Sequence, residues 1–133
     1  HMILRDVELE TTPTAIDALS RMHGRSLGAS TAEIEGATSP VMAALGHDLL
    51  LRARAARRVL REYPLLFDTE DGQRVDGSID LAFLEDGAWT VVDFKTDADP
   101  DAHRPQHLRQ LKWYVHALTA LTEARVRGYL LYV

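Results

Sequence analysis

Two aspartates and a lysine within the stretch Val75–Thr96, VDGSIDLAFLEDGAWTVVDFKT, have types and spacing suited to chemistry. The stretch contains two apolar runs, Ser78–Leu84 and Ala88–Phe94, which Glu85-Asp86-Gly87 joins. Asp-Gly between apolar runs is the strongest short-range signal of a two-residue hairpin turn, because both turn residues can adopt positive φ. We therefore predict an antiparallel hairpin that turns at Asp-Gly.

The register of this hairpin brings the charged residues together. Counting inward from the turn, Asp80 faces Asp93, and Lys95 points to the same side as Asp93 because side chains alternate along a strand. Opposed Cβ atoms lie about 5 Å apart, where two carboxylates repel by about 3 kcal/mol at an effective dielectric of about 20. Lys95 relieves part of this repulsion, and a hard divalent cation such as Mg²⁺ relieves more. The alternative is that both acids splay into water at a strand end.

Helices are predicted on the N-terminal side of the hairpin. Thr12-Pro13 combines a capping hydroxyl with proline at the first helical position, which favours a helix start. Ser30 and Glu33 form a capping box for a second helix, Thr31–Leu45, and Pro40 predicts a kink or break inside it. These signals place helical structure before the strands.

The other elements complete a mixed fold. A long helix is expected to bury a stripe of four residues at helical spacing, Leu108, Leu111, Val115 and Leu118. The passage from strand through helix to strand predicts a last strand parallel to its neighbour, hence an α/β or α+β domain with helices on a mixed sheet. The elements are a helical segment Asp48–Arg58, an edge strand Val59–Phe67 containing Pro64, a turn at Asp71-Gly72, a loop Asp97–Arg104, the long helix from Pro105 to Thr122, and a strand Val126–Val133.

Three further groups of residues are candidates with two interpretations each. Gln110 and Tyr114 lie four apart on one side of the long helix, either facing the acids and Lys95 or forming an ordinary polar face. A basic cluster either grips phosphates or is a solvated face; its members are Arg52, Arg54, Arg57, Arg58 and Arg61. Five histidines, His23, His47, His103, His107 and His116, lack a tight ligand pattern and are interpreted as structural or exposed; His103 and His107 straddle the predicted start of the helix at Pro105.

Composition restricts the class of protein. The 133 residues include 46% hydrophobic and 26% charged residues, which is typical of an ordinary globular domain with its own core. The absence of cysteine excludes disulfides, thiolate zinc sites and cysteine-ligated iron–sulfur clusters. No apolar run is long enough for a membrane span and no signal peptide is visible, so a cytoplasmic location is expected. The net charge of −5 argues against a broadly basic nucleic-acid surface, although local patches or a bound metal can still attract phosphates.

The motifs resemble those of a known family. The segments IDL with Asp80, VVDFKT with Asp93 and Lys95, and QLKWY with Gln110 and Tyr114 resemble the RecB/AddA-type nuclease domain of the PD-(D/E)XK superfamily, found at the C-terminus of UvrD-like DNA helicases. The segments REYP, MHGRSLGAS and ALGHDLL extend the resemblance over most of the chain. It implies a restriction-endonuclease-like mixed β-sheet flanked by helices, and one nuclease domain over 1–133 taken from a longer helicase–nuclease.

The resemblance also implies roles for these residues. Asp80 and Asp93 would ligate Mg²⁺ or Mn²⁺, with the backbone carbonyl of Phe94 as a third protein ligand. Lys95 would position or activate the attacking water and offset charge in the transition state. The remaining residues would act through these groups: Gln110 and Tyr114 would orient the lysine or the DNA strand, and Glu62 would support the site from the next strand.

One departure from the family pattern concerns the N-terminus. The family has an earlier motif whose histidine helps to bind the metal, and HMILRD begins where the end of that motif should fall. His1 is either that histidine or a vector residue, and the family glutamate is Arg5 here. The first motif is therefore truncated, and the isolated chain can be inactive even where its parent protein is a nuclease.

Two functions remain open on these grounds. The resemblance implies a metal-dependent DNA exonuclease that hydrolyses single strands or duplex ends unwound by a fused or partner UvrD-like helicase, in double-strand-break repair and recombination, at the bacterial nucleoid. The truncated motif and the acidic surface motivate the alternative, a non-catalytic module with the nuclease fold that binds DNA or a partner subunit.

Overall fold

The hairpin that carries the acids follows directly from its turn. The computed structural model describes residues 1–133 and shows strands β2 (Arg74–Glu85) and β3 (Ala88–Lys95) joined by a two-residue turn. Both turn residues have positive φ, 51° at Asp86 and 77° at Gly87, as a type I′ turn requires. The ladder from Glu85–Ala88 to Leu81–Val92 has the predicted register.

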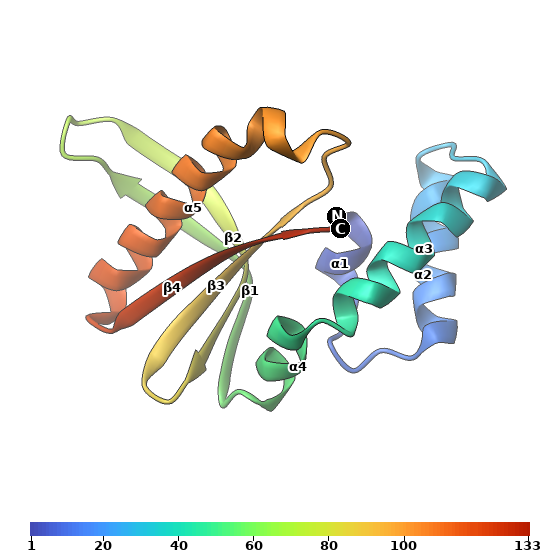
Figure 1. The fold of residues 1–133 in the computed structure, drawn as a ribbon, viewed down its shortest axis with the longest axis horizontal. Helices are drawn as coiled ribbons and strands as arrows, with labels where there is room; N and C mark the ends of the chain where they lie inside the picture. Colours follow the sequence, from blue (N-terminus) through green and yellow to red (C-terminus); the bar gives the residue numbers. More distant parts are fainter. The chain divides into compact units, whose positions relative to one another are not determined.

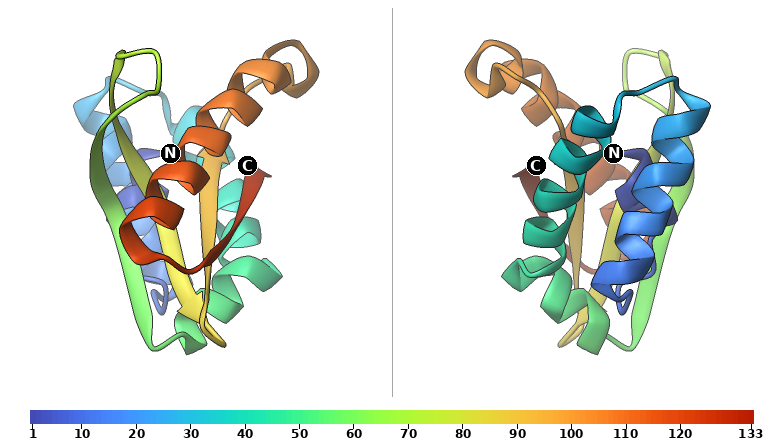
Figure 2. Two further views of the ribbon diagram at one scale, coloured as in Figure 1. Left: turned by 90° about the vertical axis from the view of Figure 1, so that its left-hand side faces the viewer. Right: turned by 90° about the vertical axis from the view of Figure 1, so that its right-hand side faces the viewer.

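The hairpin belongs to a four-stranded mixed sheet. The strand order is β1-β2-β3-β4, where β1 (Arg58–Asp68) is antiparallel to β2 and β4 (Arg125–Tyr132) is parallel to β3. Helix α5 (Pro100–Thr122) connects β3 to β4 and lies against one face of the sheet (Figures 1 and 2). The predicted α+β fold with a mixed sheet is therefore confirmed, and Pro64 lies on an edge strand as expected.

The start of α5 differs from the prediction. The helix begins at Pro100 rather than Pro105, because Asp99 caps it by accepting a hydrogen bond from the Ala102 N–H at 3.2 Å. Pro100 occupies the first helical position, where its missing N–H costs nothing, and Pro105 lies inside the helix. The predicted loop over Asp97–Arg104 is thus wrong in its second half.

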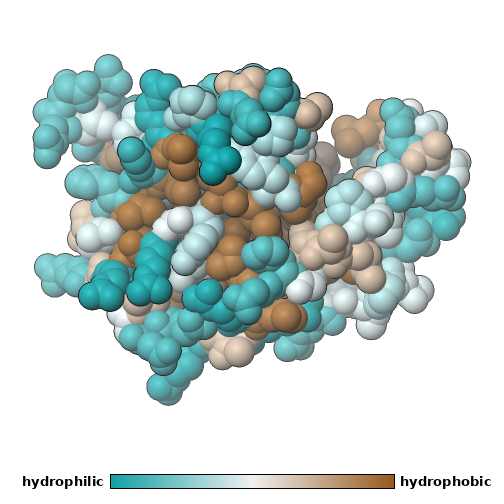
Figure 3. All heavy atoms as spheres, viewed as in Figure 1, coloured by the Kyte–Doolittle hydropathy of each residue, from teal (hydrophilic) through white to brown (hydrophobic).

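The face of α5 that packs on the sheet also differs from the predicted stripe. Leu108 is 40% exposed, whereas Tyr114 is buried beside the leucines. Apolar surface remains visible over α5 and β4 in Figure 3. The core cluster consists of Leu65, Ile79, Ala82, Trp89 and Val91 from the strands and Leu111, Tyr114, Ala117 and Leu118 from α5. Burying each large apolar side chain stabilises the fold by about 1.5–3 kcal/mol.

The inward–outward alternation of the sheet breaks beside the acids. Ile79 and Ala82 pack in the same core cluster although they are three residues apart, so the alternation of β2 shifts between them. Leu60 and Leu65 of β1 also pack on one cluster, and Glu62 between them has a φ of 46°. Positive φ is uncommon for a residue other than glycine. The shift in β2 therefore lies between Ile79 and Ala82, the segment that contains Asp80.

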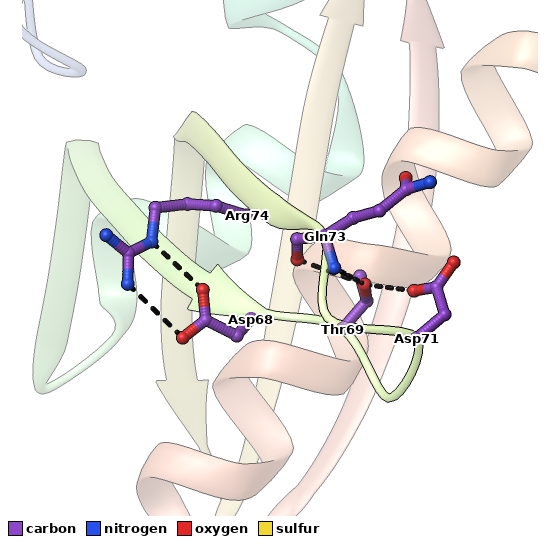
Figure 4. A network of polar contacts seen from close by, with 5 residues as sticks. All are labelled: Asp68, Thr69, Asp71, Gln73 and Arg74. Atoms are coloured by element: carbon purple, nitrogen blue, oxygen red, sulfur yellow. Dashed lines mark hydrogen bonds and ion pairs between the residues drawn. The ribbon is translucent and has the colours of Figure 1, made fainter.

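The loop between β1 and β2 is held by its own polar side chains (Figure 4). Arg74 Nε donates to Asp68 Oδ1 at 2.9 Å across the ends of the two strands. The Thr69 hydroxyl donates to the Asp71 carboxylate and accepts from the Gln73 N–H at 3.0 Å. The predicted Asp71-Gly72 turn is confirmed.

Residues His1–Ala55, together with Val133, form a second compact unit that is built of helices. The Thr12 cap is confirmed, since its hydroxyl accepts from the Ala15 N–H at 3.4 Å. The capping box is also confirmed, with the Ser30 N–H donating to Glu33 at 2.8 Å. The helices are α1 (Met2–Asp6), α2 (Pro13–Ser26), α3 (Thr31–Leu45) and α4 (Asp48–Ala55).

Two expectations for this unit need correction, and one helix was not expected. Helix α1 was not predicted, because five residues carry too little periodicity to reveal it. Helix α3 runs without interruption through Pro40, so no break occurs there. Helix α4 ends at Ala55 rather than Arg58. None of the helices combines the length and apolar character that crossing a bilayer requires.

Candidate active site

Asp93 and Lys95 form a close ion pair on β3. The two residues share the strand face of Trp89 and Val91, which α5 covers. Asp93 is 3% exposed, and Lys95 Nζ lies 2.7 Å from its Oδ2. Burial raises the pKa of Asp93 above its ordinary value, and the Lys95 ammonium offsets part of that rise. The pair is thus a buried charge with one amine as its counterion.

Asp80 lies beside this pair on the neighbouring strand. The hairpin ladder ends at Leu81–Val92, one residue before the expected pairing of Asp80 with Asp93. Instead, Asp80 Oδ2 accepts a hydrogen bond from the Phe94 N–H at 2.8 Å. Asp80 is also buried, and its charge contributes to the raised pKa of Asp93. The structure therefore brings Asp80, Asp93 and Lys95 together, and the acids do not splay into water.

A hydrogen-bonded chain links Lys95 to helix α5. Lys95 Nζ donates to Gln110 Oε1 at 2.8 Å, and Gln110 Nε2 donates to the Tyr114 hydroxyl at 2.9 Å. Tyr114 lies in the core rather than away from the leucine stripe, and burial raises the pKa of its phenol. Gly77 permits this approach, since a Cβ there would lie 2.9 Å from the phenol oxygen. Gln110 and Tyr114 thus lie on the side of α5 that faces Lys95. They do not form an ordinary polar face, which was the other interpretation.

The chemistry of these side chains suits a hard divalent cation. Mg²⁺ typically binds one or two carboxylates and keeps several waters, so two aspartates and the following Phe94 carbonyl are an adequate donor set. Asp93 Oδ2 is buried and receives no well-directed hydrogen bond besides its ion pair with Lys95. No group of three or more Asp, Glu, His or Cys side chains is arranged to hold a metal. The residues fit Mg²⁺ or Mn²⁺ better than a metal that needs a full set of protein ligands.

Other predicted site residues lie elsewhere in the chain. Glu62 is on β1 at the break in alternation, next to the strand of Asp80. His1, Arg52 and Arg54 belong to the helical unit, and their roles stay predictions. Arg52 lies 3.7 Å from Asp48, and Arg54 donates to the Leu45 carbonyl at 3.3 Å.

The remaining arginines of the basic cluster belong to the sheet unit. Arg58 stacks over the Trp89 ring, with its guanidinium carbon 5.6 Å from the ring centroid. Arg57 is exposed just before β1, and Arg61 lies within β1. Within the described structure, Arg54 and Arg58 therefore have structural contacts of their own, and DNA binding by this cluster stays a prediction.

The sequence interpretation missed a histidine close to the site. His107 Nε2 lies 2.9 Å from Asp97 Oδ2, and its Nδ1 lies 3.2 Å from the Tyr132 hydroxyl. Tyr132 pairs with Lys95 in the sheet, and the electrostatic interaction with His107 lowers the pKa of Asp93, against the larger effect of burial. The signal was present: with the helix starting at Pro100, His107 lies one turn before Gln110 and on nearly the same side.

Comparisons with known proteins agree with this arrangement. A sequence model of the PD-(D/E)XK nuclease superfamily matches residues 3–133. An ATP-dependent helicase/nuclease subunit of Staphylococcus haemolyticus is 31% identical over 111 residues, covering 68% of this chain and 9% of the relative. The corresponding ATP-dependent helicase/nuclease subunit of Heliobacterium modesticaldum is 29% identical over 110 residues, covering 67% of this chain and 8% of the relative.

The matched region is therefore less than a tenth of the length of these curated relatives. The superfamily match, in contrast, covers nearly the whole chain, including both acids, Lys95 and Gln110. The mixed sheet and the helix that closes over it are consistent with that match. The chain belongs to the PD-(D/E)XK nuclease superfamily, and its nuclease domain is of the RecB/AddA type.

Proposed function

We propose that the chain is a metal-dependent DNA nuclease domain, an exonuclease that hydrolyses phosphodiester bonds. The observation that carries this proposal is the buried cluster in which Lys95 Nζ lies 2.7 Å from Asp93 Oδ2 and 2.8 Å from Gln110 Oε1, beside Asp80. Two carboxylates and an amine in one partly enclosed place suit a reaction in which negative charge develops on a phosphate.

Each residue has a role that its contacts support. Asp80 and Asp93, with the Phe94 carbonyl, would hold Mg²⁺ or Mn²⁺. When bound, the cation supplies a Lewis acid for the phosphodiester and lowers the pKa of water. Lys95, held by Asp93 and Gln110, would orient the attacking water and offset charge on the phosphate oxygens. Gln110 and Tyr114 would fix the lysine. Glu62 would support Asp80 from β1, a role proposed from its position on the neighbouring strand.

We further propose a setting for this activity. The curated relatives are named as ATP-dependent helicase/nuclease subunits and are far longer than the matched region. Residues 1–133 would then be one nuclease domain of a longer helicase–nuclease. It would act on strands unwound by a fused or partner UvrD-like helicase, in double-strand-break repair and recombination at the bacterial nucleoid.

The test measures release of nucleotides from labelled single-stranded DNA in the presence of Mn²⁺ by the whole helicase–nuclease, because the truncated first motif can leave the isolated chain inactive. Lys95→Ala should lower the rate about 10²- to 10³-fold, the usual effect of removing one charge-stabilising donor. Arg25→Ala is the control, because it removes an exposed cation from helix α2. Cleavage at the wild-type rate by Lys95→Ala would refute the assignment.

A second candidate function rests on the Asp80 contact. Its Oδ2 already accepts the Phe94 N–H, so the carboxylate also serves to tie the two strands together. A non-catalytic module that binds DNA or a partner subunit would keep this contact for stability alone. Calorimetric titration with Mn²⁺ separates the two: the nuclease should bind Mn²⁺ and lose that binding in Asp93→Ala, whereas the module should bind DNA whether or not metal is present.

A further inference from the structure

The exposed side of α5 carries a shallow hollow next to the candidate active site. Its volume is about 420 Å³, and it is lined by Gln106, Arg109, Gln110 and Trp113. Gln110 also accepts the hydrogen bond from Lys95. The hollow therefore adjoins the group proposed to act on the phosphate, and a strand that reaches Lys95 can continue into it.

Trp113 is an unusual residue for the surface of this helix. It is 38% exposed, whereas the other tryptophan, Trp89, is 4% exposed and packed in the core. Trp113 immediately precedes the buried Tyr114, and because successive helical residues are rotated by about 100°, the two side chains point to different sides of the helix. A large ring on the surface, beside a polar hollow, has the shape and chemistry of a platform for stacking a nucleic-acid base.

Arg109 supplies the complementary charge. It is exposed on the helix surface, and no carboxylate lies within ion-pairing distance of it. Helix α5 contains no acid after Asp101, whereas the chain as a whole has a net charge of −5. Arg109 lies four residues before Trp113, a rise of about 6 Å along the helix axis. One nucleotide can therefore touch both side chains.

We propose that this hollow is a subsite for one nucleotide of single-stranded DNA. The base stacks on Trp113 and its phosphate pairs with Arg109, while a neighbouring phosphate lies at Lys95. A duplex keeps its bases stacked on each other and offers no free face to Trp113, so the subsite selects single strands. This inference rests on the proposed function and adds the residues, Trp113 and Arg109, that would hold one nucleotide of the strand.

The test is a binding measurement in which no cleavage occurs. The chain is titrated, in the presence of a metal chelator, with a labelled oligothymidylate of about 12 nucleotides, with an abasic strand of equal length and with a duplex. Fluorescence anisotropy gives the Kd. Quenching of tryptophan fluorescence reports contact at Trp113, because Trp89 is buried.

The two variants should behave differently. Trp113→Ala should raise the Kd for oligothymidylate about 5- to 150-fold, the range expected for one lost stacking contact, and leave the Kd for the abasic strand unchanged. Arg109→Ala should weaken the binding of both the oligothymidylate and the abasic strand. It should also reduce the slope of log K against the logarithm of the salt concentration by about 0.7. Trp113→Phe should restore most of the affinity. The controls are Arg127→Ala and Leu121→Ala, which remove an exposed cation and an exposed apolar side chain outside the hollow.

Three results would overturn the subsite: no quenching on binding, equal loss of oligothymidylate and abasic affinity in Trp113→Ala, or equal affinity for duplex and single strand. Failure of the proposed nuclease activity would look different. If the parent helicase–nuclease does not cleave DNA with Mn²⁺ but the chain still binds oligothymidylate through Trp113, catalysis is refuted and the subsite is kept. A chain that cleaves DNA with the same KM after Trp113→Ala keeps catalysis and refutes the subsite.

Discussion

At the scale of single residues, the site contains charged side chains that are largely buried from water. Asp93 has lost most of its solvation, and the Lys95 ammonium at 2.7 Å replaces only part of it. Such a pair gives weak support to stability, because removing two charges from water is costly. Stability alone therefore does not account for this pair in the core of a small sheet, in agreement with the proposal that the carboxylates hold a ligand.

The raised pKa of Asp93 predicts how stability depends on pH. Unfolded Asp93 titrates near 3.8, and the folded carboxyl titrates higher because it is buried. The folded state therefore binds more protons between these values, and the stabilisation from the protonated carboxyl is fully present below pH 3.8 and is lost as the pH rises through the folded pKa. Urea unfolding of the metal-free chain across this window should show that loss, and Asp93→Asn should lack it. Equal pH profiles for the two proteins would contradict the assignment.

The bridge through Gln110 predicts a cost for its removal. Gln110→Ala takes one partner from Lys95 and one from the buried Tyr114 hydroxyl, so the free energy of unfolding should fall by about 1–3 kcal/mol. Gln106→Ala, one turn earlier on the exposed side, should change it by less than about 0.5 kcal/mol. Urea unfolding of both variants measures the difference, and equal costs would show that the bridge is not formed in solution.

At the scale of elements, the close approach of α5 to β4 holds Gln110 over the strand ends. Gly128 makes this approach possible, because a Cβ there would lie 2.8 Å from Val115 Cγ2 and 2.9 Å from Leu111 Cγ. Both contacts are with side chains of α5, so an added side chain forces Val115 and Leu111, or the helix itself, to shift. The position of the helix, and with it the bond from Gln110 to Lys95, depends on this missing side chain.

Gly128→Ala should therefore destabilise the chain by about 1–3 kcal/mol, the usual cost of overpacking. Gly36→Ala provides a matched comparison, since a Cβ at Gly36 in α3 meets nothing within 4 Å. That substitution should stabilise the chain by about 0.5–1 kcal/mol through helix propensity. The Tm from thermal unfolding should fall for Gly128→Ala and rise for Gly36→Ala. A change of the Tm in the same direction for both variants would contradict the packing explanation.

Local signals explain which elements the sequence predicts and which it does not. The hairpin and its register follow from Asp86-Gly87 alone, because positive φ at both positions permits one turn type. The start of α5 cannot be predicted in this way, because Pro100 and Pro105 both suit a first helical position. Only the Asp99 cap and the contact of His107 with Asp97 distinguish the two prolines. The positive φ at Glu62 has no local signal, because glutamate, unlike glycine or asparagine, is not a residue type that favours this conformation.

The same reasoning applies to the site. Asp80, Asp93 and Lys95 were predicted as neighbours because their separation in the hairpin is fixed by the register. The bond from Asp80 to the Phe94 N–H was not predicted, because a regular ladder would continue past Leu81–Val92 and place Asp80 opposite Asp93. His107 was missed because its position depends on where α5 begins.

At the scale of the whole molecule, binding of a cation should be linked to unfolding. A ligand that binds only the folded chain stabilises it by RT ln(1 + [L]/Kd), about 2.7 kcal/mol at a hundred times the Kd. Mn²⁺ should therefore raise the Tm of the wild-type chain, and a chelator should reverse the rise. Asp93→Ala should show no rise, because it removes one of the two carboxylates. An equal shift in both proteins would place the Mn²⁺ elsewhere.

The order of the strands has a consequence for how the chain acquires its structure. Strands β1, β2 and β3 are neighbours both in the chain and in the sheet, so each pairing closes only a short loop. Hairpins of this kind form in about 1–10 μs, whereas the parallel pairing of β4 must wait for α5 to fold across. During synthesis, the two aspartates and the lysine can therefore meet before the last strand has left the ribosome, and the helix that carries Gln110 arrives at a charged centre that already exists.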